Sequence, residues 1–513
     1  MKKIISMIVA LVMALTLLTA CSSGFTGVKE YGGEVSSNGG FAVQKGDYVY
    51  FINGKEDYTA DNTFGTPQKG ALVRAKLADL KNFGTMAACE MVIPKLMYTE
   101  YTDANTGVYI FGDYVYYATP STVKNKKGEV QNTNVEFTKT KLDGTNTKVI
   151  ATVSGLDTPY RFVSDAEGNV YLTVYTTVDG DNCLVTYTAD GKEDHKSRAV
   201  SAYVLSDDAT ATYAYYEKKG YNEQLEQDES FSEVYRYALT HAEGDAAEGE
   251  LVLSGAGMYS SATGIGTQGV TFTFVKLTAS NLFVYETYVD TSVSTGTRYY
   301  GWALENVTTD PAATYASKVL LNDGTANAST IFASNSVYVA LDTIIYNDTT
   351  YGLVRYNYTD KDNLKTFGIE HLVYNSDLMS YTYSYDDGEY MYYYGNNYYY
   401  RIKIADVIAK TDNVERMTYT ATSTTSDFYR PEIIDGVLLI ANTNDPMYNY
   451  VCAYDVTAAA TMTDDEIEAF ATSDRAHALA RLNYRAGIIT KEDAEKVTEY
   501  IDENYPEDSS SAN

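Results

Sequence analysis

The chain has 513 residues, of which 45% are hydrophobic, and its formal net charge is −30 at pH 7. This length allows a large core and more than one domain. Such an acidic chain repels polyanions, so we expect no nucleic-acid partner and no electrostatic attraction to anionic lipid.

The N-terminal segment has the features of an export signal. Lys2 and Lys3 precede an apolar run over residues 4–18, which is too short and wrongly flanked for a membrane span. The run ends in Leu18-Thr19-Ala20-Cys21, which resembles the bacterial lipobox; the alternative is a short buried helix that ends in a chance cysteine. The resemblance implies a signal peptide over residues 1–20 and a lipidated tether over 21–30. The protein would then be a lipoprotein, held by Cys21 on the extracellular face of the bacterial cell membrane.

The composition of the remaining chain predicts an all-β fold. It has 51 tyrosines, 16 phenylalanines and only eight prolines. Tyrosine favours strands and half-exposed faces, where the ring packs and the hydroxyl finds a polar partner. The tyrosines are therefore interpreted as strand residues, with sugar-binding aromatics as the sharper alternative.

A short strand motif recurs along this all-β region, which points to a repeat architecture. The sequence GDYVYF at residues 46–51 returns as GDYVYY at 112–117. Weaker copies occupy residues 167–172, 211–216, 281–285, 335–339, 387–392 and 435–440. The motif is taken as the second strand of each unit, and a related strand, taken as the third, follows at residues 72–77, 234–239, 353–358 and 399–404. Each unit is predicted to be a small antiparallel sheet that must stack on its neighbours.

The succession of GDYVYF, L-x-R-x-x-L and a DG turn resembles bacterial β-propeller domains of uncharacterised function. Those domains are distantly similar to the YWTD-type propellers of lipoprotein receptors, although no YWTD tetrapeptide occurs here. The resemblance covers roughly residues 31–460 and implies a β-propeller of eight four-stranded blades, or seven if two weak copies share a blade. A pair of β-sandwiches is the other fold considered. A propeller implies a tendency to bind ligands and specifies no reaction.

Long polar connections between the second and third strands are the predicted binding face, because loops longer than a hairpin needs are often functional. These connections span residues 53–69, 118–134 and 217–232. The candidate binding residues within them are Tyr58, Asp61, Asn62, Lys126, Tyr221 and Asn222. Disorder is the alternative explanation for loops of this length.

After residue 460 the alternation of a strand stops and a helical pattern begins. The stretch from Ala480 to Val497 resembles a short SHOCT-like helical hairpin, and Thr490 followed by Asp493 approximates a capping box. Residues 461–505 are predicted to form this hairpin, and residues 506–513 a disordered tail. The resemblance implies oligomerisation or docking to a partner, which we favour slightly, while capping of the propeller is the alternative.

No motif assigns a reaction or a cofactor. The four histidines are scattered, GIGTQG at residues 264–269 precedes a strand instead of a helix, and DGDN at 179–182 lacks the later acidic ligands of a calcium loop. Cys89, Cys183 and Cys452 form no CxxC pair; one disulfide is possible, but Cys183 and Cys452 are predicted to be buried apolar residues. We therefore name no catalytic residue, no metal ligand and no cofactor.

These features together predict a lipid-anchored extracellular binding or scaffold protein. Its propeller loops would bind a protein or a glycan, and its helical hairpin would dock or oligomerise. The alternative is an extracellular propeller enzyme that acts on polysaccharide or peptide. A convergent set of carboxylates with raised pKa at the central channel would favour the enzyme, and a smooth polar channel with aromatic loops would favour binding.

Overall fold

The computed structural model describes residues 27–504 with internal gaps. The longer gaps are 82–88, 99–106, 128–133, 206–212, 240–248, 261–266, 321–337, 358–369, 372–381, 407–412, 419–428, 442–449 and 466–473. Cys21, the predicted signal peptide and the last nine residues lie outside the described residues.

The described strands form eight sheets of three to five strands in chain order, called sheets 1 to 8 here, and one further sheet of two strands; neighbouring strands pair antiparallel. Sheet 1 contains β1 (Val35–Ser37), β2 (Ala42–Lys45), β3 (Tyr48–Ile52), β4 (Leu72–Lys76) and β5 (Glu90–Ile93). Sheet 2 contains β6 (Tyr109–Phe111), β7 (Tyr114–Pro120), β8 (Asn134–Lys141) and β9 (Lys148–Ser154). Sheet 3 contains β10 (Tyr160–Ser164), β11 (Val170–Val178), β12 (Asp181–Thr188) and β13 (Glu193–Ser197). Sheet 4 contains β14 (Ala202–Val204), β15 (Tyr213–Asn222), β16 (Gln227–Ala238) and β17 (Glu250–Ser254).

The second half repeats this pattern after a small two-stranded sheet of β18 (Tyr259–Ser260) and β19 (Thr267–Gln268). Sheet 5 contains β20 (Thr271–Leu277), β21 (Leu282–Val289), β22 (Thr297–Leu304) and β23 (Lys318–Leu320). Sheet 6 contains β24 (Tyr338–Ala340), β25 (Thr343–Asp348), β26 (Gly352–Asn357) and β27 (Glu370–His371). Sheet 7 contains β28 (Thr382–Asp386), β29 (Tyr390–Gly395), β30 (Tyr398–Lys403) and β31 (Val414–Arg416), and sheet 8 contains β32 (Glu432–Ile434), β33 (Val437–Ile440) and β34 (Cys452–Asp455).

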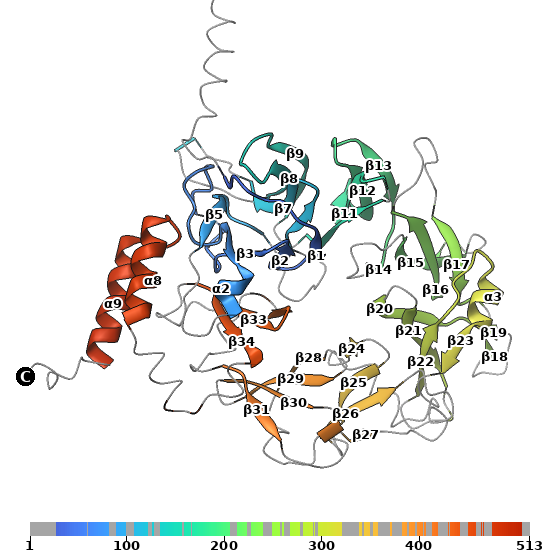
Figure 1. The fold of residues 1–513 in the computed structure, drawn as a ribbon. Coiled ribbons are helices and arrows are strands. Elements are labelled where there is room, and N and C mark those ends of the chain that lie inside the picture. The colour runs from blue at the N-terminus through green and yellow to red at the C-terminus, as the bar shows by residue number, and fades with distance from the viewer. Residues whose placement is uncertain are drawn as a thin grey trace, which may run out of the picture.

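The described helices are few. They are α2 (Leu77–Lys81) after β4, α3 (Pro311–Ala316) between β22 and β23, and a C-terminal pair, α8 (Asp474–Arg485) and α9 (Lys491–Asn504). No helix in this part of the chain has both the length and the apolar content that a membrane span requires. The fold is therefore β-propeller-like and all-β, and Figure 1 shows its sheets following one another around a ring.

The repeat motif occupies the second strand of the four-strand unit in seven of its eight copies, counting sheet 1 from β2. The sixth copy, at residues 335–339, was assigned to the wrong strand. It overlaps β24, the first strand of sheet 6, and β25 (Thr343–Asp348) is the second strand. The error has a simple cause, because two short β-branched and aromatic runs lie within ten residues of each other and pattern alone does not rank them.

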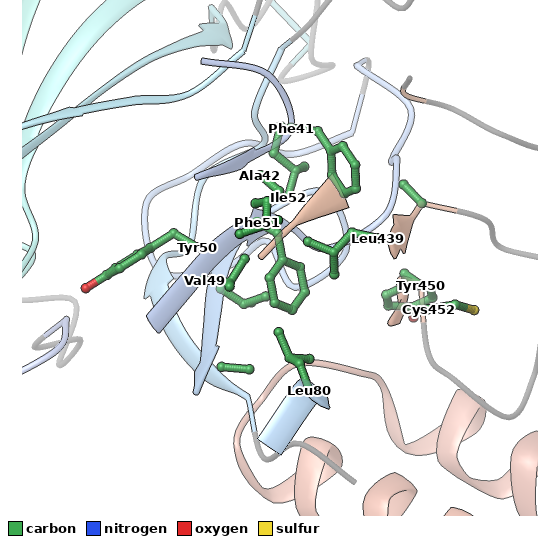
Figure 2. Close-up of a cluster of buried hydrophobic side chains, with 14 of the residues drawn as sticks. Phe41, Ala42, Val49, Tyr50, Phe51, Ile52, Leu80, Leu439, Tyr450 and Cys452 are labelled. Carbon is green, nitrogen blue, oxygen red and sulfur yellow. The ribbon is translucent and has the colours of Figure 1, made fainter. Parts of the chain in front are cut away.

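The first and last sheets lie side by side. The backbone N–H of Phe41, just before β2, donates to the Glu432 carboxylate of β32 over 2.7 Å, and the Phe41 ring stacks on Tyr429 with centroids 5.6 Å apart. Figure 2 shows side chains from the N-terminal end, among them Phe51 and Leu80, in one buried cluster with Leu439 of β33. The shared core joins the two ends of the β-rich region.

The C-terminal helices form a hairpin that packs against the sheets. Thr490 and Asp493 form the predicted capping box, since the Asp493 N–H donates to the Thr490 hydroxyl over 3.0 Å. The hairpin is buried in the same core as sheets 1 and 8 through Ala480, Val497 and Ile501 of its helices and Ile488 and Ile489 of its turn. These buried contacts favour the capping alternative over docking, while oligomerisation and a docking partner stay predictions.

Two polar contacts join the hairpin to segments next to the first and last sheets. The buried Asn53 amide, after β3, donates to the Ile488 carbonyl over 2.7 Å, and the Tyr450 hydroxyl, before β34, donates to the Asp493 carboxylate. Partial burial alone would raise the pKa of Asp493, but the hydrogen bonds from Tyr450 and Thr490 outweigh it and hold that pKa below its usual range. Asp493 is therefore ionised near neutral pH, and the contact is charge-assisted.

The three cysteines in the described part of the chain are free thiols. Cys183 and Cys452 are buried in strands, as expected of small apolar residues. Burial raises the pKa of Cys89 to about 12, helped by the charge of Glu90, so this thiol is also unreactive at neutral pH.

Candidate functional site at the junction of sheets 2 and 3

A cross-strand triad of Tyr, Arg and Glu recurs on the second, third and fourth strands of several sheets. In sheet 1, Tyr50 lies opposite Arg74, and Arg74 lies opposite Glu90. The same register holds for Tyr215, Arg236 and Glu250 in sheet 4, and for Tyr392, Arg401 and Glu415 in sheet 7. Each arginine is paired with its own glutamate, at 2.7, 3.2 and 2.5 Å. The charge of each arginine is thus neutralised within its own sheet.

The arginines of sheets 1 and 4 also reach backbone outside their own sheet. Arg74 donates to the Glu30 carbonyl, in an N-terminal segment that itself pairs with sheet 2 through Val28 N–H and Leu142 O at 3.1 Å. Arg236 donates to the Val307 carbonyl in the connection after β22 of sheet 5, over 2.7 Å. The triad therefore has two roles, cross-strand pairing and filling of the junction with the next sheet.

Sheet 2 departs from this pattern. Tyr116 occupies the tyrosine position, but its partner on β8 is Lys139, and Lys139 lies opposite Lys148 on β9. Two lysines thus replace the arginine and the glutamate. Their charges are met from the next sheet, where Asp190 Oδ1 lies 3.2 Å from Lys148 Nζ and 3.7 Å from Lys139 Nζ.

A cavity of about 920 Å³ lies beside these substituted positions, between sheets 2 and 3. Sheet 2 contributes Tyr116 and Lys139 to its walls, and sheet 3 contributes the β10–β11 and β12–β13 turns. The lining residues are Tyr116, Lys139, Asp165, Glu167, Gly168, Asn169, Val170, Tyr171, Thr188, Ala189, Asp190, Lys192 and Asp194. The two tyrosines are buried, whereas Glu167, Asn169, Asp190 and Lys192 are exposed, so the cavity has a tyrosine base and polar walls.

Internal hydrogen bonds hold the β10–β11 turn in shape. The Asp165 carboxylate accepts from the Asn169 N–H over 2.7 Å and from the Asn169 side-chain amide over 2.8 Å. Gly168 has φ of 86°, a left-handed conformation that glycine adopts without strain. The turn is therefore pre-organised, and it presents Glu167 at the cavity.

The β12–β13 turn is drawn close to sheet 2 by a glycine. A Cβ atom at Gly191 would lie 2.7 Å from the Ile150 carbonyl oxygen of β9, and Gly191 has φ of 81°. Any larger residue would push the turn away from sheet 2. The close approach at Gly191 places the adjacent Asp190 within reach of Lys148.

The charges of the cavity act on one another. Hydrogen bonding from Lys148, with the charges of Lys148 and Lys139, holds the pKa of Asp190 below its usual range. Burial raises the pKa of Tyr116 to about 12, with smaller contributions from Tyr114 and Asp190. Burial likewise raises the pKa of Tyr171, and the carboxylates of Asp165, Asp194 and Glu167 add to this. Both tyrosine hydroxyls are therefore protonated near neutral pH and can donate hydrogen bonds.

The cavity lies at the opposite end of the strands from the predicted binding face. In an antiparallel meander, the connections between strands 1 and 2 and between strands 3 and 4 share one end, and the connection between strands 2 and 3 lies at the other. The cavity uses the former, at residues 165–169 and 188–192. The candidate residues chosen from the sequence belong to the latter.

Asn62 does not face solvent, as a loop binding residue was expected to do. It is fully buried, its amide donates to Thr119 Oγ1 over 2.6 Å and to the Pro120 carbonyl over 2.8 Å, and its Oδ1 accepts from the Leu96 N–H over 2.7 Å. The prediction for Asn62 is therefore corrected: the side chain joins the 53–71 connection to sheet 2. A polar residue in a long loop was assumed to face solvent, and here it satisfies buried backbone groups instead.

Tyr221 and Asn222 also differ from their predicted setting. They are the last residues of β15, paired with Asp228 and Gln227 of β16, so the predicted loop over residues 217–232 is mostly an extended hairpin. Strand pairing continues although most residues before the turn have a low β-propensity, so tertiary pairing overrides the local preference here.

Tyr58, Asp61 and Lys126 remain untested as binding residues. The Tyr58 ring lies 5.3 Å from the Tyr98 ring, and Asp61 Oδ1 accepts from the Thr63 N–H over 3.1 Å in a local turn. Lys126 is exposed in the connection after β7. These three residues lie on the 2–3 connections of sheets 1 and 2, away from the cavity.

No metal site is indicated among the described residues, which contain no group of three His, Cys, Asp or Glu side chains arranged to hold an ion. The residues that form the cavity were missed in the sequence because each belongs to an ordinary turn. A signal was present, however: the third strand reads LVRAKL at residues 72–77 but FTKTKL at 137–142, so the repeat itself marks the substitution of arginine by lysine.

Comparison with known proteins returns structural neighbours only. No family model matches the chain, and no curated protein matches it. The crystal structure of the polysaccharide lyase Uly1 is similar at 9% identity and a TM-score of 0.33, covering 85% of this chain and 93% of that one. A prolyl endopeptidase structure gives 10% identity and 0.37, covering 81% and 55%. A GH43 β-1,3-galactosidase gives 8% identity and 0.23, covering 87% and 98%. These low scores, spread over three activities, carry no argument about the reaction of this chain.

Proposed function

We propose that this protein is a closed eight-bladed propeller that binds a carbohydrate chain in the cavity between sheets 2 and 3. The eight successive sheets and the contact of the first with the last support the closed ring. The cavity is the observation that carries the binding function, since its 920 Å³ is within the range of small-molecule sites.

The polarity of the cavity favours a ligand with many hydroxyl groups. Glu167 supplies acceptors, Lys192 supplies donors, and the protonated Tyr116 and Tyr171 supply both. An apolar ligand would leave these groups without hydrogen bonds, which is costly, whereas a sugar hydroxyl can donate to a carboxylate and accept from an ammonium group. The cavity is acidic on balance, which fits the neutral sugars of a glycan better than a polyanion.

Variants of two lining residues test this proposal. Glu167→Gln removes a charged acceptor on an exposed turn, and Tyr171→Phe removes one hydroxyl while it keeps the ring. Each should weaken binding to the oligosaccharides that score on a glycan array about 5- to 30-fold, the size of one or two lost hydrogen bonds. Calorimetric titration of purified protein measures the change.

Asp181→Asn is the matched control, because Asp181 lies at the far end of sheet 3 and pairs with Arg198 over 3.1 Å. Its binding should equal that of the unmodified protein. Loss of affinity in this control, or full affinity in both cavity variants, would place the binding site elsewhere.

A second candidate function is cleavage of the bound chain. The carboxylates of Asp165, Glu167, Asp190 and Asp194 line the same cavity, and glycoside hydrolysis uses two carboxylates on either side of the bond. Incubation of the protein with the bound oligosaccharides, followed by mass spectrometry, separates the two functions. Shorter products would support an enzyme, and intact oligosaccharides would support binding alone.

We further propose that Cys21 carries a lipid that holds the protein on the extracellular face of the bacterial membrane. The basic, apolar and small-residue order before Cys21 supports this. Cys21→Ser should abolish incorporation of a labelled fatty acid and move the protein from the membrane to the soluble fraction, because the acyl chains supply the membrane affinity. An unchanged membrane fraction in this variant would disprove the anchor.

A further inference from the structure

The ion pairs beside the cavity differ from the others of the repeat in where the neutralising charge comes from. Arg74, Arg236 and Arg401 each use a glutamate on the fourth strand of their own sheet. Lys139 and Lys148 occupy those two positions in sheet 2, so a second cation lies where the other sheets have their glutamate. The anion, Asp190, belongs to a turn of the next sheet.

Asp190 is an exposed partner that the two lysines share. Its side chain is 83% exposed, and both lysines approach a single oxygen, Oδ1, at 3.2 and 3.7 Å. Exposed ion pairs of this kind contribute little to stability and are screened by salt. Lys139 and Lys148 thus form an anion site at the edge of the cavity, and the Asp190 carboxylate occupies it.

We propose that Asp190 sets the specificity of the cavity by excluding acidic sugars. This inference rests on the proposed carbohydrate binding and names its ligand class. A uronate carboxylate would have to displace Asp190 from Lys139 and Lys148, and would meet repulsion from Asp190 and from Glu167 on the neighbouring turn. A neutral sugar meets neither cost. With Asp190 neutralised, the lysine pair becomes a binding site for a ligand carboxylate.

The test compares neutral pentasaccharides with their C6-oxidised uronate counterparts. The pairs are β-1,4-linked glucose and glucuronate, galactose and galacturonate, and mannose and mannuronate. The measured quantity is the ratio of affinities, acidic over neutral, for the unmodified protein and for Asp190→Asn. The ratio should be below one in the unmodified protein and should rise about fivefold in Asp190→Asn, as expected for one weak exposed charge interaction.

Two further measurements keep the outcome clear. Near-ultraviolet circular dichroism checks that each variant is folded. In the double variant Asp190→Asn with Lys148→Met, the ratio of acidic to neutral affinity should fall most of the way back to its value in the unmodified protein. The reason is that the ligand carboxylate loses one of its two cations. An unchanged ratio in Asp190→Asn, while sugars still bind, overturns the specificity role alone. Absence of binding to all six pentasaccharides by either protein overturns the carbohydrate proposal and this inference with it.

Discussion

Removal of residues 461–513 should lower the free energy of unfolding by about 5–10 kcal/mol. Ile488, Ile489, Val497 and Ile501 are buried in the core shared by sheets 1 and 8, and each buried side chain of this kind contributes about 1.5–3 kcal/mol. Part of this burial is within the hairpin itself, so the sum is an upper bound. The hairpin also contacts Asn53 after β3 and Tyr450 before the last strand of sheet 8, so its loss should also weaken the contact between the first and last sheets.

A pair of point variants separates this packing from an autonomous hairpin. Ile488→Ala removes a buried side chain at the contact and should cost about 2–4 kcal/mol. Leu482→Ala, on the same hairpin, removes a side chain that is 46% exposed and should change stability by less than about 0.5 kcal/mol. Denaturant unfolding followed by the fluorescence of Trp302, the single tryptophan, measures both changes. Unchanged stability of the truncated protein, with loss of self-association, would restore the docking role.

Replacement of Arg74 by methionine should cost about 2–4 kcal/mol. The arginine side chain is 3% exposed, and it donates to the Tyr50 hydroxyl over 3.1 Å and to the Glu30 carbonyl, and pairs with Glu90. Methionine keeps much of the apolar stem but leaves the buried hydroxyl and the carbonyl without their donor, and such groups are expensive to leave unpaired. The guanidinium also lies 3.9 Å from the centroid of the Tyr48 ring, and this attraction is lost as well.

Lys139→Met is the matched comparison, because Lys139 has the same register position in sheet 2. Its side chain is 19% exposed, and its ion pair with Asp190 is 3.7 Å long and open to solvent. The expected cost is below about 1 kcal/mol. Urea unfolding of the two variants in parallel gives the difference directly. Similar costs at the two positions would show that the lysine fills the junction as the arginine does, and that the triad has no special role there.

Much of the β fold could be predicted from the sequence because its signal is periodic. GDYVYF and its copies combine a turn with a β-branched and aromatic run, which has few other stable conformations. The third-strand copies at residues 72–77 and 399–404 were also placed correctly, as β4 and β30. The prediction was wrong for the sixth copy, where two such runs are adjacent. The position of a strand within its sheet depends on tertiary pairing, and local preference alone does not determine it.

The candidate site was harder to predict, for a physical reason. The cavity is formed where one sheet fails to fill its junction with the next, and that is a property of two neighbouring sheets together. Gly191 looks like a routine turn residue until its contact with Ile150 of β9 is known. Asn62 shows the reverse case, because a polar loop residue proved to be buried and fully hydrogen-bonded. The length and polarity of a loop do not show which of its polar side chains form hydrogen bonds with buried backbone groups.

Hydrogen–deuterium exchange with and without a bound oligosaccharide tests the central claim most directly. If the ligand occupies the junction of sheets 2 and 3, protection should increase at residues 165–171 and 188–194 and at the end of β8 near Lys139. The connections at residues 53–71 and 118–134, at the other end of the sheets, should not change. Protection confined to those connections would contradict the account and would return the binding site to the face first chosen from the sequence.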